Sequence, residues 1–109
     1  MKKKIKVYKT GAKREEKSNK SYVHSIKGYT RLRFGFHMTK GAKAHGDKNW
    51  EKGFPTDSYL ESLDRHLAQY LMGDRSEDHL SAIIFNTQGL MINEQKEGIK
   101  IDEYFNKKK

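Results

Sequence analysis

The sequence contains no cysteine, so neither a disulfide framework nor a thiolate metal site can form. Hydrophobic residues are also scarce, at 34% of 109 residues with a mean hydropathy of −1.02. A chain of this length forms one domain with a small core, near the size at which association between copies adds needed burial. We therefore expect an oligomer, and specifically a homo-oligomer.

Several other features are missing. No apolar run approaches the 18 or more residues of a membrane span, and the basic N-terminus lacks the apolar stretch of a signal peptide. There is no glycine-rich phosphate loop followed by Lys and Ser or Thr, and no Ser/His/Asp or Cys/His nucleophile pattern. We expect a cytoplasmic protein without a membrane partner, and set aside P-loop chemistry and nucleophilic catalysis.

Positive charge is abundant, and its excess lies at the N-terminus. Residues 1–40 contain thirteen Lys and Arg residues and two acidic residues, whereas residues 41–109 contain ten basic and twelve acidic residues. A segment of this kind attracts nucleic acid, nucleotide phosphates and acidic proteins alike, and a solvated tail is an equal alternative. Charge alone therefore does not distinguish a nucleic acid from a nucleotide.

Two stretches in the second half of the chain have helical periodicity, and we predict helices over 58–72 and 76–91. The short turn 73–75 between them makes the helices antiparallel neighbours. We expect their apolar stripes to face each other. The stripes comprise Leu60, Leu63, Leu67, Tyr70 and Leu71 in the first helix, and Leu80, Ile83, Ile84, Phe85, Leu90 and Met91 in the second.

The first helix also carries end signals. Ser58 and Glu61 match a capping box, in which each side chain satisfies an unpaired backbone N–H, and Gly73 suits a left-handed helix stop. Antiparallel pairing then predicts polar contacts along the apolar seam. It places His66 near Ile83, Leu63 near Asn86 and Tyr70 near His79.

Residues 22–43 fit a strand or a helix, and we choose a helix because no turn signal interrupts the stretch. Within it, Arg31 and Arg33 are either anion ligands or solvated charges. Residues 1–10 predict a short edge strand, 11–20 a loop, and 99–105 a second short strand that could pair with the first.

The predicted fold class is therefore mainly α: a small helical domain built on an antiparallel helix pair, with an optional short β pair from the termini. We divide the chain into a basic, partly extended segment (1–20), a helical core (21–94) and a C-terminal segment with a lysine tail (95–109).

A polar stretch precedes the helix pair. It contains His45, Asp47, Asn49 and the single tryptophan, Trp50. Trp50 either anchors this loop against the core or stacks on a base. His45 and Asn49 either contact the polar edges of a ligand or brace the loop.

An ordered set of motifs resembles the phage-encoded family known as dATP/dGTP diphosphohydrolase, N-terminal type. The resemblance covers about 10–94 and implies a small helical fold and a nucleotide ligand. The motifs are TGAKR at 10–14, KGAKAHGDKNWEKG at 40–53, RHL at 65–67, GD at 73–74, EDHL at 77–80, and Asn86.

A nucleotide can be bound by side chains that this sequence contains. Lys13, Arg14 and Arg65 are candidate phosphate ligands, and an arginine can make bidentate contacts to phosphate. Trp50 or Tyr59 can stack on the base. The remaining candidates could hydrogen-bond a base or ribose, namely His45, Asn49, His66, His79 and Asn86.

Hydrolysis of a nucleotide usually needs Mg²⁺ or Mn²⁺ held by a carboxylate cluster. Asp64, Glu77 and Asp78 are candidate catalytic residues, and Asp64, Asp78 and His79 are candidate metal ligands. Antiparallel pairing separates Glu61 from Asp78 by roughly 15 Å, so a carboxylate cluster would need a second copy of the chain.

Two hypotheses follow for a phage nucleotide-binding protein. It sequesters a purine nucleotide or cyclic-nucleotide signal to counter host defence, or it is a metal-dependent dATP/dGTP-type diphosphohydrolase. A third hypothesis is nucleic-acid binding through residues 1–40. If the chain is phage-encoded, its expected location is the cytoplasm of the infected host cell.

Overall fold

The computed structural model describes residues 5–7, 9, 13–15 and 23–102. The chain divides into two compact units, Met1–Val23 with Lys100–Lys109, and His24–Ile99. The described strands belong to the first unit, and the three α-helices belong to the second.

The first unit contains two short strands. β1 (Ile5–Val7) pairs antiparallel with β2 (Lys13–Glu15), and Lys6 lies opposite Arg14. The predicted N-terminal strand is confirmed, but the predicted loop over 11–20 is wrong where β2 forms. Ile99 and Ile101 are not in a strand, and Tyr104 and Phe105 lie outside the described residues. Strands that are close in sequence pair at a lower entropic cost than strands from opposite ends of a chain.

A short 3-10 helix, η1 (Val23–Ser25), precedes α1 (Gly28–His45) in the chain. The predicted helix over 22–43 is therefore confirmed in its main part. α1 ends at Gly46, whose φ of +100° is a conformation that glycine adopts without a side-chain clash. A second 3-10 helix, η2 (Asn49–Lys52), follows and carries the polar stretch.

α2 (Thr56–Leu71) confirms the first helix of the predicted pair. The predicted capping box is wrong because the helix begins two residues earlier than expected, with Pro55 at its N-cap and no side-chain cap. Ser58 therefore lies inside the first turn, where its backbone N–H donates to the Pro55 carbonyl at 2.9 Å. Gly73 follows the helix with φ +91°, as a left-handed stop requires.

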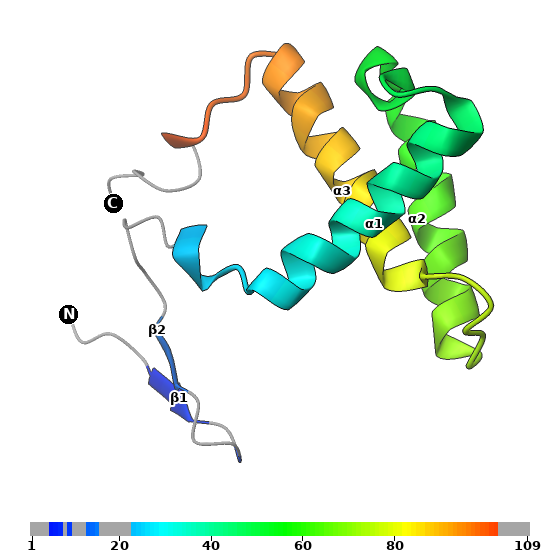
Figure 1. Ribbon diagram of the computed structural model, residues 1–109. Helices are drawn as coiled ribbons and strands as arrows, with labels where there is room; N and C mark the ends of the chain where they lie inside the picture. Colours follow the sequence, from blue (N-terminus) through cyan, green and yellow to red (C-terminus); the bar gives the residue numbers. More distant parts are fainter. Residues whose placement is uncertain (1–4, 8, 10–12, 16–22, 103–109) are drawn as a thin grey trace. The chain divides into compact units, whose positions relative to one another are not determined.

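α3 (His79–Lys96) confirms the second helix, although it begins three residues later than predicted and extends further. Asp78 is its N-cap, and its carboxylate accepts a hydrogen bond from the backbone N–H of Ser81 at 3.1 Å. The helix ends before Gly98, which has φ +94°. α3 contacts both α1 and α2 and is the central element of this unit (Figure 1).

The contact between α2 and α3 is polar and small-residue rich, contrary to the expected facing of two apolar stripes. Leu67 and Leu71 are 41% and 74% exposed, whereas His66 and His79 are buried. Small side chains let the helix backbones approach closely, so the periodic leucines turn outward. The buried set on α2 and α3 is Tyr59, His66, His79, Ser81, Ala82, Asn86 and Gly89.

The register of this contact differs from the predicted one at the His66 end and agrees with it to within one residue at Asn86. His66 meets His79, where the prediction placed His66 near Ile83 and His79 near Tyr70, whereas the Asn86 side-chain amide bonds to Ser62, within one residue of the predicted Leu63. Within the part of the chain that the structure describes, no helix is both long enough and apolar enough to cross a membrane.

Candidate functional site

A cavity of about 740 Å³ lies in the second unit, between α1 and η2 on one side and α2 and α3 on the other. Most of its lining surface is apolar, although about half of the residues that line it have polar or charged side chains. Ser58 and His66 both line it and lie eight residues apart on α2, so the cavity extends about 12 Å along that helix.

One end of the cavity is aromatic. The ring of Tyr59 lies edge-on to Phe54 at a centroid distance of 5.7 Å and to Phe85 at 6.2 Å. The Tyr59 hydroxyl oxygen accepts a hydrogen bond from the backbone N–H of Phe54 at 3.2 Å. Trp50, on η2, also lines the cavity and is 38% exposed, so it is available for stacking and is not a core anchor.

The middle of the cavity contains a polar pair. Asn86 is buried, and its side-chain amide donates to Ser62 Oγ at 3.1 Å and to the Ala82 carbonyl at 2.9 Å. These bonds hold the amide in one orientation at the α2–α3 contact. Asn86 and Ser62 therefore present fixed polar atoms to the cavity.

His37 lines the cavity from α1. It stacks with Phe34 at a centroid distance of 6.2 Å and is tilted against Phe85 at 6.3 Å. Burial lowers the pKa of His37, and the nearby Lys40 acts in the same direction, while Asp78 and Glu77 act against it. His37 is therefore held more in its neutral form than a solvated histidine.

The other end of the cavity is ionic. Arg33 on α1 makes a bidentate contact with the Asp78 carboxylate, from Nε at 2.8 Å and from Nη2 at 2.9 Å. Asp78 also accepts a hydrogen bond from Ser81 Oγ at 2.8 Å. The Arg33 hydrogen bond, opposed in part by burial, holds the pKa of Asp78 well below its usual range and raises the pKa of Arg33. This ion pair fixes α1 against the N-terminus of α3.

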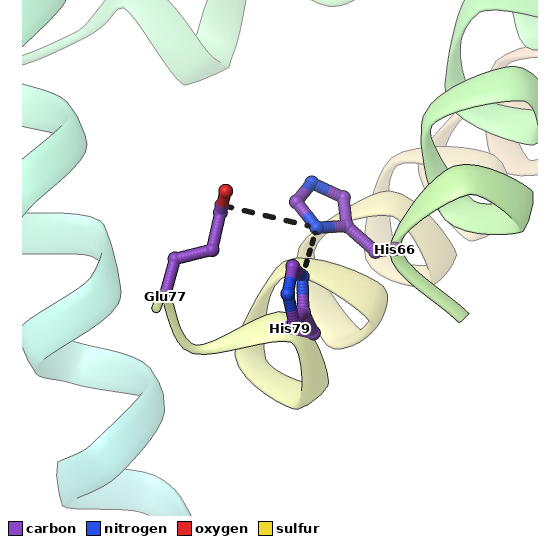
Figure 2. Close-up of side chains that lie close together, drawn as sticks. All are labelled: His66, Glu77 and His79. Atoms are coloured by element: carbon purple, nitrogen blue, oxygen red, sulfur yellow. Dashed lines mark hydrogen bonds and ion pairs between the residues drawn. The ribbon is translucent and has the colours of Figure 1, made fainter. Parts of the chain in front are cut away.

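Two histidines meet beside this ion pair. His66 Nδ1 lies 2.8 Å from His79 Nδ1, and Glu77 Oε1 lies 3.9 Å from His66 Nδ1 (Figure 2). His79 is 1% exposed and His66 is 8% exposed, while the side chain of Glu77 is 48% exposed. His66 and Glu77 line the cavity, and His79 lies behind them.

Asp74 fixes the orientation of His79. The Asp74 carboxylate lies 2.5 Å from His79 Nε2 and accepts a hydrogen bond from Ser76 Oγ at 2.9 Å. The contact with His79 is the main cause that lowers the pKa of Asp74. Because an ionised carboxylate only accepts, we assign the proton of His79 to Nε2 and a lone pair to its Nδ1.

The position of the His79 proton also determines which ring nitrogen of His66 carries a proton. Its Nδ1 carries the proton that bonds to His79 Nδ1, since two bare nitrogens would repel at 2.8 Å. Burial lowers the pKa of His66, against the opposing effect of Glu77. A shift of the His66 proton from Nδ1 to Nε2 would leave both Nδ1 atoms with a lone pair that can bind an ion.

These residues form a candidate metal group. Among residues 5–7, 9, 13–15 and 23–102, the group of three that could hold an ion is His66, Glu77 and His79, with ligand atoms within 4.8 Å of one another. The structure brings His79 into this group, but neither Asp64 nor Asp78. Asp64 is exposed and does not line the cavity.

The structure separates the other residues predicted for the site. His45, Asn49, Trp50, His66, Glu77, Asp78 and Asn86 line the cavity. Arg65 does not, because it is exposed and pairs with Glu61 at 3.4 Å. Lys13 and Arg14 lie on β2 in the first unit, outside the cavity-bearing unit.

Two residues that contribute to the candidate site, Asp74 and His37, could not be recognised from the sequence. Asp74 gives a weak signal, a carboxylate five residues before His79 in the turn between helices. His37 gives none, because residues 22–43 have no clear period. Arg33, predicted as an anion ligand or a solvated charge, instead bonds through its guanidinium to Asp78 at the cavity wall.

Comparison with known proteins adds one finding. A sequence profile of the family described as dATP/dGTP diphosphohydrolase, N-terminal, matches residues 10–103. No curated protein and no solved structure matches the chain. The matched segment includes every residue that lines the cavity.

Proposed function

The chain belongs to the dATP/dGTP diphosphohydrolase N-terminal family, and from this premise we propose that its cavity binds and hydrolyses a purine deoxynucleoside triphosphate. The observation that carries the proposal is the polarity of the cavity, which has an aromatic end and an ionic end about 12 Å apart along α2. A purine nucleotide has the same two-ended chemistry, with a flat base and a polyanionic tail.

The base belongs at the aromatic end. Trp50 offers a partly exposed ring, and stacking of a base on an aromatic ring contributes about 1–3 kcal/mol. His45 and Asn49 line the same end and can hydrogen-bond the edges of a purine. Asn86 and Ser62, in the middle of the cavity, lie between this end and the ionic end, where the sugar would lie.

The phosphates belong at the ionic end. Lys40 lines the cavity from α1 and attracts the anionic tail, whereas the guanidinium of Arg33 is already paired with Asp78. Glu77 faces the same space, and its carboxylate would repel the phosphates unless a cation lay between them. The ionic end therefore fits a triphosphate that arrives together with a divalent cation.

The proposed reaction is hydrolysis of a phosphoanhydride. Water attacks the α-phosphorus, the bond from that phosphorus to the α,β-bridging oxygen breaks, and a nucleoside monophosphate and inorganic pyrophosphate form, with one proton of the water released to solvent. A divalent cation at His66, Glu77 and His79 would neutralise phosphate charge and activate water. The chain itself orients the base, positions the phosphates through Lys40, and limits access of bulk water through the apolar walls.

Sequestration without turnover is a second candidate. It is favoured by the donor group, which contains one carboxylate, whereas phosphohydrolase sites usually contain several. In this case a purine or cyclic nucleotide would be held intact in the same cavity, which in a phage protein would counter host defence. Nucleic-acid binding through residues 1–40 is a third proposal, supported by the local excess of positive charge.

Recovery of the ligand distinguishes these proposals. The full chain is incubated with dATP or dGTP, with Mn²⁺ or with EDTA, and the products are separated by chromatography. Hydrolysis predicts nucleoside monophosphate and inorganic pyrophosphate with Mn²⁺ and intact ligand with EDTA. Intact, tightly bound ligand under both conditions would support sequestration, and absence of any binding would contradict both.

A further inference from the structure

We propose that His66, His79 and Glu77 form a binding site for a first-row transition-metal ion, with Asp74 as the positioning residue for His79. Only the role of the ion in hydrolysis rests on the proposed function. Binding of the ion itself requires no nucleotide, because all three ligands come from the protein. The proposal names a class of ion that differs from the Mg²⁺ usually paired with nucleotides.

The spacing of the ligand atoms fits a single ion. The two Nδ1 atoms lie 2.8 Å apart, and all three ligand atoms lie within 4.8 Å of one another. Metal–nitrogen bonds are about 2.0–2.1 Å long, so two nitrogens on one ion can be at most about 4.2 Å apart. The two imidazoles can therefore share one ion once the hydrogen bond between them is broken and the His66 proton has moved from Nδ1 to Nε2.

The arrangement around His79 is typical of a metal ligand. A histidine that binds a metal through one ring nitrogen usually donates the other N–H to a carboxylate, which fixes its tautomer and orientation. Asp74 occupies this position on His79 Nε2, and Ser76 in turn donates to Asp74. The lone pair of His79 Nδ1 is thus aimed at His66 and toward the proposed ion.

The site is also reachable. His79 is buried, but Glu77 and His66 line the cavity, so an ion can enter from the cavity side. Figure 2 shows the carboxylate of Glu77 directed toward His66, with the three residues coming from α2, the loop before α3 and α3 itself. Protein ligands from three positions leave further coordination sites open for water or phosphate.

The donor set decides the class of ion. Mg²⁺ prefers six oxygen ligands and keeps several waters, whereas imidazole suits Zn²⁺, Fe²⁺, Co²⁺ and Ni²⁺, and mixed imidazole–carboxylate sites also bind Mn²⁺. Two nitrogens and one oxygen therefore fit Mn²⁺ and fit Mg²⁺ poorly. The two-histidine, one-carboxylate set therefore fits first-row transition ions from Mn²⁺ to Zn²⁺ better than it fits Mg²⁺.

The test is a titration of the full chain with CoCl₂, followed by visible absorption and calorimetry in the absence of nucleotide. We expect one Co²⁺ per chain, with affinity unchanged by an excess of Mg²⁺. Glu77→Gln should weaken binding about tenfold or more, since it replaces an anionic ligand on an exposed, fold-tolerant position. Glu61→Gln, an exposed carboxylate on α2, is the matched control and should bind like the wild type.

Variants of Asp74 test separately whether this residue positions His79 for the ion. Asp74→Ala should weaken Co²⁺ binding by about 10–100-fold and change the Co²⁺ spectrum, while Asp74→Asn, which keeps an acceptor, should restore part of the affinity. His66→Gln should abolish the spectrum. Absence of Co²⁺ binding, or equal binding by the wild type, Glu77→Gln and His66→Gln, would overturn the proposal. Because nucleotide is absent, this failure is separate from a failure of the proposed function.

Discussion

A Cβ atom placed on Gly89 of α3 would overlap the ring of Tyr59 on α2, with Cζ as the nearest ring atom. The tyrosine ring therefore occupies the space that a side chain at position 89 would fill. This contact sets how closely the two helices approach and holds Tyr59 at the aromatic end of the cavity. The absence of a side chain at one position thus shapes the candidate site.

Gly89→Ala tests this contact. We expect a loss of about 1–3 kcal/mol in the free energy of unfolding, because an overpacked Tyr59 must move and this outweighs the helix propensity of alanine. Gly35→Ala on α1 is the matched control, since a Cβ there meets no atom within 4 Å. It should stabilise by about 0.5–1 kcal/mol. Urea unfolding of both variants checks the prediction, and a stabilised Gly89→Ala would contradict it.

Asp78 acts both as a helix cap and as the partner of Arg33, and substitutions separate the two roles. Asp78→Ala removes both and should cost about 1–3 kcal/mol. Asp78→Asn keeps a capping side chain and should cost less than about 1 kcal/mol, and Arg33→Met should cost less than Asp78→Ala. Asp57→Asn, at an exposed position in the first turn of α2, is the control, and urea unfolding of the four variants gives the costs. Equal costs for Asp78→Ala and Asp78→Asn would show that the cap contributes little.

Stability should fall in weak acid, and part of this loss belongs to His37. Its pKa in the folded chain is lowered by burial below the ordinary value of 6.5, so the unfolded chain takes up the proton first. The stability contributed by neutral His37 is therefore complete above pH 6.5 and is lost as the pH falls from there toward the folded-state pKa.

His37→Phe removes this titration while retaining an aromatic ring between Phe34 and Phe85. Its stability should vary less with pH than that of the wild type below pH 6.5, as measured by urea unfolding at several pH values. A pH profile of His37→Phe that matches the wild type would contradict the assignment.

Self-association is expected from the exposed apolar side chains. In the described residues the buried hydrophobic side chains are Tyr59 and Ala82, while Leu67 and Leu71 on α2 are exposed. A second copy of the chain would bury this outer face of α2 and add the apolar area that the core lacks. Light scattering should give a mass above 12.8 kDa per particle. Leu67→Ser combined with Leu71→Ser should lower it, whereas Ala68→Ser should not.

Helix positions could be predicted from the sequence because they depend on local periodicity and on glycine stops. The predicted pair corresponds to α2 and α3, and Gly73 has the left-handed conformation expected of it. The helix starts are less accurate, since Pro55 is the cap in place of Ser58, and the second helix begins after Asp78 and not at residue 76. Capping patterns recur by chance, and packing decides which is used.

The contact between α2 and α3 could not be predicted in the same way. Periodic leucines usually mark a buried face, but here small and polar residues such as Ser81, Asn86 and Gly89 are buried in their place. The register that joins His66 to His79 follows from this choice of face. The contribution of Asp74 depends on a loop conformation, for which sequence periodicity gives no signal.

Calorimetric titration of the full chain with dATP and dGTP in the presence of Mn²⁺ tests nucleotide binding in the cavity most directly. We predict binding of one nucleotide per chain that is weakened about tenfold or more by Trp50→Ala and is weakened by Lys40→Ala. The controls are Tyr70→Ala, whose ring contacts Arg75 outside the cavity, and Lys43→Ala, one turn from Lys40 and outside the lining. Binding that responds equally to the cavity variants and the controls, or no binding at all, would contradict a nucleotide site in this cavity.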